Sequence, residues 1–167
     1  MNIEVKKSKK PLDYTRTIKI LEKRAHDVSL GLKNELLWVL EHKTVYASGK
    51  TSKDYEVIDK SIKVIKTNRG GKITLHAPGQ KIVYFVINLN KRGKDIRKLL
   101  NKIEGCIISI LKEYNIKSFP DKKNIGIWVK DKTKSKKIGA IGIRVKKWIA
   151  YHGFALNVSN DLSGYGK

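Results

Sequence analysis

The run Ile82-Val83-Tyr84-Phe85-Val86-Ile87 constrains the fold of this chain more than any other segment. A strand with one face in water alternates apolar and polar residues, whereas a strand covered on both faces reads as a continuous apolar run. This run is too apolar for a one-sided surface strand. We therefore predict that residues 81–89 form a central strand of a sheet.

Two segments on either side of this run have the spacing of amphipathic helices, with apolar residues three or four positions apart. The first covers residues 12–32, with Asp13 as its expected N-cap and Gly31 close to its expected C-terminus. The second covers residues 94–115. Cys106 lies beside the apolar face of this second helix, so we expect it to be a buried structural thiol. The expected apolar faces comprise Tyr14, Ile18, Leu21, Ala25, Val28 and Leu32 in the first helix, and Ile96, Leu99, Leu100, Ile103, Ile107, Ile110, Leu111 and Tyr114 in the second.

The other apolar runs are short and rich in β-forming residues. We expect a loop over residues 41–50 and a charged turn over residues 131–136. The order of helix, strands, helix and strands predicts an α+β fold with a mixed or antiparallel sheet and flanking helices. A length of 167 residues fits one domain, residues 1–167. The further expected strands cover residues 36–40, 62–66, 72–76, 125–129, 137–143 and 148–158.

The formal net charge of +22 needs an explanation. Lysines could neutralise the phosphates of a nucleic acid, could steer an acidic protein partner, or could simply cover a solvated surface. They are dispersed along the whole chain without a nucleic-acid-binding motif, which argues against nucleic acid as the partner. No apolar run is long enough to span a bilayer and no secretory leader is evident, while a single cysteine excludes an internal disulfide. These features predict a cytoplasmic protein that does not act on membranes.

The segment Arg69-Gly70-Gly71-Lys72-Ile73-Thr74-Leu75-His76-Ala77-Pro78-Gly79-Gln80 concentrates glycines, a turn signal and two polar side chains between β-rich runs. Gly70 and Gly71 permit positive φ or close approach of the backbone to a ligand. Pro78-Gly79 favours a turn. The segment by itself fits a binding site and a β-hairpin with glycine bulges equally well.

Two further segments have residue types suited to chemistry. In residues 137–142, Lys137 precedes small residues that leave room for a ligand, although an ordinary edge lysine is the alternative. His152-Gly153 could direct backbone N–H groups at a developing oxyanion, although a half-buried histidine bonded to backbone is the alternative. His76 and His152 lack the spacing of metal ligands, and no phosphate-binding loop is present. We expect neither a metal nor a cofactor.

Taken together, four segments resemble those of lipoyl(octanoyl) transferases. They occur in the order and spacing of that family, and the resemblance extends from about residue 12 to the end of the chain. The matching segments are Leu40-Glu41-His42 with Val45-Tyr46, residues 69–80, Lys137-Ile138-Gly139-Ala140-Ile141-Gly142-Ile143-Arg144, and Tyr151-His152-Gly153-Phe154-Ala155-Leu156-Asn157-Val158.

This resemblance implies a fold shared with lipoate–protein ligases and biotin protein ligases. It also implies a reaction, in which an octanoyl group leaves the thioester of acyl carrier protein, is carried on an enzyme cysteine, and passes to a lysine of a lipoyl domain. The implied acceptors are the lipoyl domains of 2-oxoacid dehydrogenases and the glycine cleavage H protein. Acyl carrier protein and lipoyl domains are typically acidic, so a basic surface would speed their encounter.

The resemblance also implies site residues. Lys137 falls where the family has a lysine that lowers the pKa of the nucleophilic cysteine, as a neighbouring ammonium would. The residues expected to line the acyl pocket are Arg69, Gly70, Gly71, Lys72, Ile73, Thr74, Leu75, His76, Ala140, Ile141, Gly142, Gly153, Phe154 and Ala155.

The chain departs from the family pattern at the nucleophile. The family carries its cysteine in a Pro-Cys-Gly motif, which by spacing would fall shortly beyond Lys167, and Cys106 is expected to lie far from the pocket. We expect residues 1–167 to be a fragment that lacks this motif and is inactive as it stands; a natural member without the cysteine is the alternative. Ala77 also replaces a glycine usual in the family, which concerns local backbone geometry only.

Two other functions stay open on the sequence alone. An ATP-dependent lipoate–protein ligase of the same fold needs no cysteine, because it activates a free acid as an adenylate. A catalytically inactive module that binds acyl groups or acidic carrier domains would explain the net positive charge without a catalysed reaction. The segments 74–80 and 151–153 resemble the transferases more than the ligases.

Overall fold

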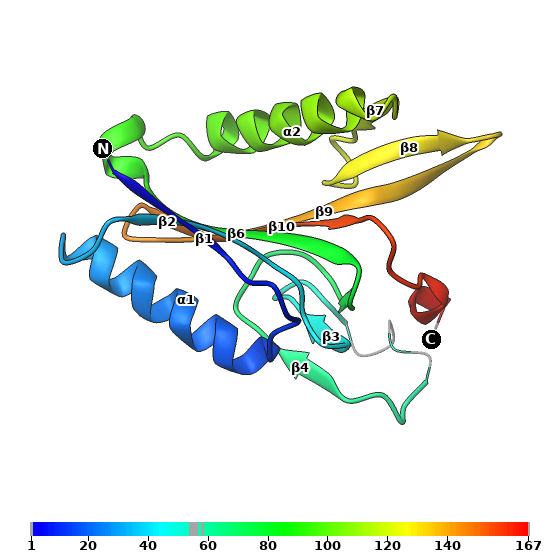
Figure 1. Cartoon of the computed structure of the whole chain (residues 1–167), viewed down its shortest axis with the longest axis horizontal. Coiled ribbons are helices and arrows are strands. Elements are labelled where there is room, and N and C mark those ends of the chain that lie inside the picture. The colour runs from blue at the N-terminus through cyan, green and yellow to red at the C-terminus, as the bar shows by residue number, and fades with distance from the viewer. Residues whose placement is uncertain (1, 54–56, 58, 167) are drawn as a thin grey trace.

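The computed structural model describes residues 2–53, 57 and 59–166, and Figure 1 shows its layered arrangement. The elements in chain order are β1 (Ile3–Lys7), α1 (Tyr14–Ser29), β2 (Glu35–Leu40), β3 (Val45–Ser48), β4 (Val64–Lys66), β5 (Thr74–His76), β6 (Gln80–Asn88), a 3₁₀ turn η2 (Leu89–Arg92), α2 (Ile96–Glu113), β7 (Ser118–Pro120), β8 (Ile127–Asp131), β9 (Lys134–Lys146), β10 (Ile149–Asn157) and a 3₁₀ turn η3 (Ser163–Gly166).

Within the described residues, seven strands form a large sheet in the order β1-β2-β6-β10-β9-β8-β7. The β1–β2 pair is parallel and the other pairs are antiparallel. β6 lies between β2 and β10, so the prediction of a central strand at residues 81–89 is confirmed. The mixed sheet with flanking helices also confirms the predicted α+β fold.

The helix α1 covers one face of the large sheet (Figure 1). The Asp13 carboxylate accepts a hydrogen bond from the backbone N–H of Arg16 at 2.8 Å, which confirms the predicted N-cap. Leu21 and Val28 of α1 pack against Trp38 of β2 in a core that extends over β6 and β10. Burial of each such side chain contributes about 1.5–3 kcal/mol. Leu32, placed in this apolar stripe by its spacing, is exposed beyond the end of the helix.

The helix α2 covers the opposite face (Figure 1). Leu99, Ile103 and Ile107 are buried against β6, β8 and β10, whereas Ile110 and Tyr114, expected on the same face, are exposed. In the described part of the chain, no helix is both long enough and apolar enough to cross a membrane.

The prediction for Cys106 was wrong, because its thiol belongs to an exposed residue. The buried positions of α2 lie at Leu99, Ile103, Ile107 and Leu111, and this stripe is narrower than the apolar sequence pattern suggests. Cys106 therefore lies outside the stripe.

Four assignments also differ from the sequence expectations. Residues 41–50 were expected to be a loop but contain β3. The charged turn expected over residues 131–136 is present but is confined to Lys132 and Thr133, because β8 and β9 occupy the rest of that range. β1 was not predicted, because it is an edge strand with every side chain exposed and therefore has no core-facing pattern. β7 was also not predicted, and it has only three residues.

A small sheet of the order β4-β3-β5 lies on the same side of the large sheet as α1 (Figure 1). β5 pairs with β3 and not with β6. The turn at Pro78-Gly79, in which Gln80 N–H donates to the Ala77 carbonyl at 3.1 Å, therefore passes the chain from the small sheet to the large one. The segment 69–80 is thus not the β-hairpin that was one of its two interpretations.

The contact between β6 and β10 depends on a glycine. A Cβ built on Gly153 would lie 1.9 Å from the carbonyl oxygen of Val83, well inside van der Waals contact. The close approach of the two central strands is possible only because position 153 has no side chain.

We expect Gly153→Ala to lower the free energy of unfolding by at least about 3 kcal/mol, because the new methyl group meets backbone rather than a movable side chain. Urea denaturation monitored by circular dichroism measures the change. The matched control is Gly105→Ala in α2, where an added Cβ meets nothing within 4 Å. This control should be neutral or stabilising by up to about 1 kcal/mol. Equal effects of the two substitutions would contradict the role given to Gly153.

Candidate active site

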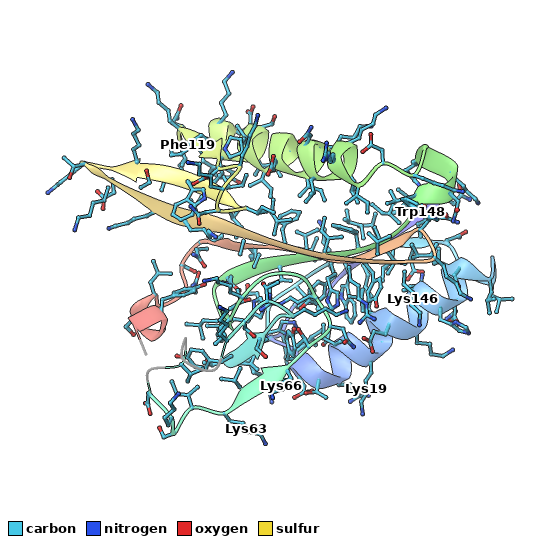
Figure 2. The ribbon with its side chains drawn as sticks, turned by 180° about the vertical axis from the view of Figure 1, so that it is seen from behind. Lys19, Lys63, Lys66, Phe119, Lys146 and Trp148 are labelled. Atoms are coloured by element: carbon cyan, nitrogen blue, oxygen red, sulfur yellow. The ribbon has the colours of Figure 1, made fainter. Side chains whose placement is uncertain are left out.

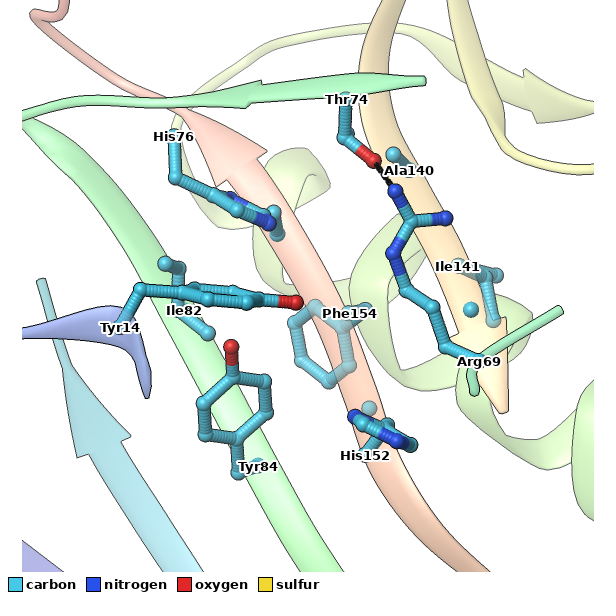
Figure 3. Close-up of a pocket in the computed structure, with 13 residues that line it drawn as sticks. Tyr14, Arg69, Thr74, His76, Ile82, Tyr84, Ala140, Ile141, His152 and Phe154 are labelled. Carbon is cyan, nitrogen blue, oxygen red and sulfur yellow. Dashed lines mark hydrogen bonds between the residues drawn. The ribbon is translucent and has the colours of Figure 1, made fainter. Parts of the chain in front are cut away.

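A cavity of about 50 Å³ lies between the small sheet and the large sheet (Figure 3). It is lined by residues from the start of α1, the segment before β5, and the strands β5, β6, β9 and β10. The lining residues are Tyr14, Arg69, Thr74, His76, Ile82, Tyr84, Ala140, Ile141, Gly142, His152, Gly153, Phe154 and Ala155.

Arg69 is a buried cation held by neutral oxygen atoms. Its guanidinium donates to the carbonyl oxygens of Ala47 at 2.6 Å and Gly70 at 2.9 Å, and to the Thr74 hydroxyl. Among the described residues no carboxylate forms an ion pair with it, and its Nε has no hydrogen-bond partner. Burial lowers the pKa of Arg69 from its usual value, and Tyr14 opposes that shift. The guanidinium remains charged, because the ordinary pKa of arginine lies far above neutrality.

A buried tyrosine that lines the cavity, Tyr84, is hydrogen-bonded to a buried histidine, His42. His42 Nδ1 lies 3.0 Å from the Leu12 carbonyl oxygen and its Nε2 lies 2.9 Å from the Tyr84 hydroxyl. Because a carbonyl can only accept, Nδ1 carries the proton, and the Tyr84 hydroxyl donates to Nε2. Burial lowers the pKa of His42 to about 4, so the ring is neutral near pH 7.

His76 is fixed by a chain of amides. Its Nδ1 donates to the Gln80 side-chain oxygen at 2.7 Å, and the Gln80 amide in turn donates to the Asn157 side-chain oxygen at 2.9 Å. Its ring stacks on Tyr14 with the centroids 5.6 Å apart. Burial lowers the pKa of His76 to about 3. The cavity is therefore walled by a neutral imidazole that cannot rotate freely.

His152 lies in β10 with an unusual backbone conformation, φ +71°, which non-glycine residues rarely adopt. Its side chain is fully buried and stacks on Tyr151, with the ring centroids 5.0 Å apart. Neither ring nitrogen has a hydrogen-bond partner among the described residues. Burial lowers the pKa of His152 to about 4, and the charges of Arg69 and Arg144 act in the same direction.

Glycines at positions 70 and 142 allow the Arg69 segment to approach β9 closely. A Cβ on Gly142 would lie 3.3 Å from Cδ of Arg69, and a Cβ on Gly70 would lie 3.3 Å from the carbonyl oxygen of Ile143. Both distances are tighter than ordinary contact. The Arg69 segment thus packs directly on the backbone of β9.

The structure brings together most of the residues that the sequence singled out for an acyl pocket. Lys72, Ile73 and Leu75 are separated from them, since they line a second cavity of about 230 Å³ together with Tyr46, Val57, Ile62, Val64, Gly164 and Tyr165. Gly70 and Gly71 line neither of these two cavities. The predicted residues that share the first cavity are Arg69, Thr74, His76, Ala140, Ile141, Gly142, Gly153, Phe154 and Ala155.

The separation follows from the alternation of side chains along β5. Thr74 and His76 point to one face of the small sheet and lie in the first cavity, whereas Leu75 points to the other face and lies in the second. The alternation along β5 therefore divides this contiguous motif between the two cavities.

Sequence reasoning did not include Tyr14, Ile82, Tyr84 or the His152 side chain among the pocket residues. Tyr14 belongs to the apolar stripe of α1, and Ile82 and Tyr84 belong to the apolar run of β6. All three were assigned to the core, where they are indeed buried. The tyrosine hydroxyls were the available signal, because a buried phenol needs a polar partner or a ligand.

Lys137 and Cys106 lie outside both cavities. The Lys137 ammonium donates to the Ile125 carbonyl at 3.2 Å and lies 4.9 Å from the centre of the Trp128 ring. Partial desolvation lowers its pKa, and Asp121 opposes this shift. Cys106 is on α2, on the other side of the large sheet from the small sheet (Figure 1). Where the structure describes the chain, it contains no group of three or more His, Cys, Asp or Glu residues that could hold a metal ion.

Residues 13–167 match the family model described as the lipoyl protein ligase A/B catalytic domain. An octanoyltransferase from Wolbachia pipientis (strain wPip) is 43% identical over 154 residues, which cover 92% of this chain and 75% of that protein. An octanoyltransferase from Anaplasma phagocytophilum is 38% identical over 167 residues, which cover 99% of this chain and 80% of that protein.

Solved structures share the fold at low sequence identity. A lipoate-protein ligase A bound with ATP superposes with a TM-score of 0.75 at 17% identity, covering 99% of this chain and 70% of that one. A bipartite lipoate protein ligase from Thermoplasma acidophilum gives a TM-score of 0.69 at 16% identity, covering 99% of this chain and 65% of that one. These neighbours confirm the predicted biotin/lipoate ligase-like fold.

The three neutral histidines predict a pH-dependent stability. The pKa values of His42, His76 and His152 lie below the ordinary value of 6.5, so in acid the unfolded chain binds protons that the folded protein does not. The free energy of unfolding should therefore be highest above pH 6.5 and should fall as the pH is lowered toward 4. Each histidine contributes up to about 1.4 kcal/mol per pH unit in that window.

Urea denaturation at about pH 7, about pH 6 and about pH 5 measures this dependence. High salt in all samples screens the repulsion among the surface lysines, which would otherwise also destabilise the protein as it gains protons. An unfolding free energy that stays constant between about pH 7 and about pH 5 would overturn the assignment of neutral buried histidines.

Proposed function

The chain belongs to the octanoyltransferase family, within the lipoyl protein ligase A/B catalytic domains, and we propose that it transfers octanoyl groups from acyl carrier protein to lysines of lipoyl domains. One observation carries the proposal. Three segments distant in sequence, residues 69–76, 140–142 and 153–155, contribute to one cavity that has apolar walls and a buried cation. Apolar walls suit an acyl chain, and a cation suits the oxygen of its carbonyl.

The proposed reaction has two acyl-transfer steps. An enzyme thiolate attacks the octanoyl thioester, a new C–S bond forms, and the phosphopantetheine sulfur leaves and takes a proton. The ε-amine of a lipoyl-domain lysine then attacks the enzyme thioester, an amide forms, the enzyme thiolate leaves, and the amine proton passes to solvent. Each step is an exchange at one carbonyl carbon, so donors placed at the carbonyl oxygen serve both.

We propose that the thiol comes from outside residues 1–167. Cys106 is the single cysteine of the chain and lies across the sheet from the cavity. Residues 1–167 by themselves would then bind the acyl group without completing the transfer. Lys137, on the strand that also carries Ala140 and Gly142, would be the ammonium that lowers the pKa of the incoming thiol.

The cavity must widen to hold an octanoyl chain. Its volume of about 50 Å³ is the space of one or two water molecules. Ile82, Ile141 and Phe154 are apolar side chains that line it and would form the walls around the aliphatic part. The polar end, at Arg69 and His152, would hold the carbonyl.

The basic surface supports acidic partners. Lysines such as Lys19 on α1, Lys66 on β4 and Lys146 on β9 lie on different elements (Figure 2), and the chain has a net charge of +22. A positive field of this kind speeds encounter with acidic proteins. Acyl carrier protein would be the donor, and the lipoyl domains of 2-oxoacid dehydrogenases and the glycine cleavage H protein the acceptors. The Thermoplasma ligase of similar fold was studied with its E2 lipoyl domain.

A chimera tests the proposed reaction. A C-terminal segment that carries the Pro-Cys-Gly motif of the family is joined after Lys167. With octanoyl-acyl carrier protein and a lipoyl domain, we expect an octanoyl-enzyme thioester and an octanoylated lysine, both detected by mass spectrometry. Replacing the cysteine of the added segment by alanine should abolish both products.

Two controls separate the rival functions. Cys106→Ser in the chimera should leave transfer unchanged; loss of the acyl-enzyme in this variant would make Cys106 the nucleophile. Free octanoate with ATP should give no product with residues 1–167 or with the chimera. An ATP-dependent product would replace the transferase by a lipoate–protein ligase activity, and binding without any transfer would leave a carrier-binding module.

A further inference from the structure

The side chain of His152 does not follow the regular alternation of side chains along β10, and it lies on the opposite face of the sheet from the expected one. Regular alternation along β10 would place Tyr151 and His152 on opposite faces. Tyr151 belongs to the core beneath α1. The His152 ring nevertheless stacks on Tyr151 and meets Tyr84 edge-on, with centroids 6.3 Å apart. The positive φ of His152 turns the ring to this side, where it lines the first cavity.

This conformation is strained, and such strain persists at positions where the surrounding structure imposes it, commonly at ligand sites. Gly153, which has no room for a side chain against Val83, follows directly and fixes the path of β10. The strand therefore holds the His152 ring in the cavity at a conformational cost.

Hydrogen bonding gives a second, independent observation. Both ring nitrogens of His152 are buried and have no hydrogen-bond partner among the described residues, and the same holds for Nε of Arg69. Buried polar groups without partners are rare in folded proteins, since each loses its hydration on burial. These two side chains line one cavity, as Figure 3 shows, so a ligand there would meet both of them.

The chemistry of the two groups selects the ligand atom. A neutral imidazole has one N–H donor and one acceptor nitrogen, and Nε of arginine is a donor only. Two donors beside apolar walls match an oxygen that accepts two hydrogen bonds, as a carbonyl oxygen does. A phosphate or carboxylate could pair with Arg69, but the neutral histidine would offer it no second positive charge.

We propose that the His152 side chain binds the carbonyl oxygen of the acyl group by donating its ring N–H, with Arg69 Nε as the second donor. This inference rests on the proposed function, because it requires an acyl thioester in the cavity. It differs from the role that the sequence suggested for this segment, in which the backbone N–H groups at residues 152–153 would be the donors. Because the carbonyl oxygen gains negative charge during attack, loss of one such donor lowers the rate of acyl transfer by about 10²–10³-fold.

Binding measurements on residues 1–167 test the assignment without requiring catalysis. The probes are S-octanoyl-pantetheine, which has the carbonyl, and the thioether S-octyl-pantetheine, which lacks it. We expect the protein to prefer the thioester, and His152→Gly to reduce this preference by about threefold to tenfold, the worth of one hydrogen bond. Glycine is the replacement of choice because it accepts the positive φ of this position. The matched control is His26→Asn at an exposed histidine of α1, which should leave the preference unchanged.

Nitrogen NMR of ¹⁵N-histidine-labelled protein adds a readout that needs no substitution. The imidazole signals of His152 should shift with S-octanoyl-pantetheine and not with the thioether, while those of His26 stay in place. Failure to bind either probe would overturn the proposed function. Two results would overturn the role of His152 and leave the proposed function standing. One is binding of both probes with equal affinity. The other is a preference for the thioester that is unchanged by His152→Gly, together with His152 signals that do not shift.

Discussion

The buried guanidinium of Arg69 is the interaction on which the candidate site depends. It ties β3 to β5 through the Ala47 carbonyl and the Thr74 hydroxyl, and it holds its own segment through the Gly70 carbonyl. A buried cation satisfied by neutral dipoles keeps its full positive charge available to the cavity, whereas a carboxylate partner would cancel it. This charge also acts on the surroundings, since it lowers the pKa of both His76 and His152. One side chain thus sets the position of the small sheet and the electrostatic character of the site.

The fold could be predicted wherever the sequence pattern reflects burial. The apolar run in β6, the helical spacing in α1 and α2, and the Asp13 cap all follow from which side chains face the core. β1 escaped prediction because backbone pairing holds it at the sheet edge while its side chains face solvent. The burial of Cys106 was predicted wrongly, because the spacing of apolar residues on a helix locates the centre of the buried face more reliably than its borders.

The site was predictable only in part, for a different reason. Composition and spacing suggested ligand binding at residues 69–80 but could not bring Arg69 together with Ala140 and Phe154; the family resemblance did that. No local pattern announces the left-handed φ of His152, because it arises from the path of β10 between its neighbouring strands. Tyr14 and Tyr84 show the same limit of sequence-based prediction. Their sequence pattern assigns both to the core, whereas the direction of their rings, which the pattern does not give, makes them line the cavity.

The strand β5 has a consequence that extends beyond the first cavity. Its three residues separate two hollows of unequal size, with Thr74 and His76 on one side and Leu75 on the other. Because β5 contributes side chains to both cavities, a change in the position of β5 would change the shape of both. The shape of the first cavity is therefore coupled to the shape of the second through one short strand.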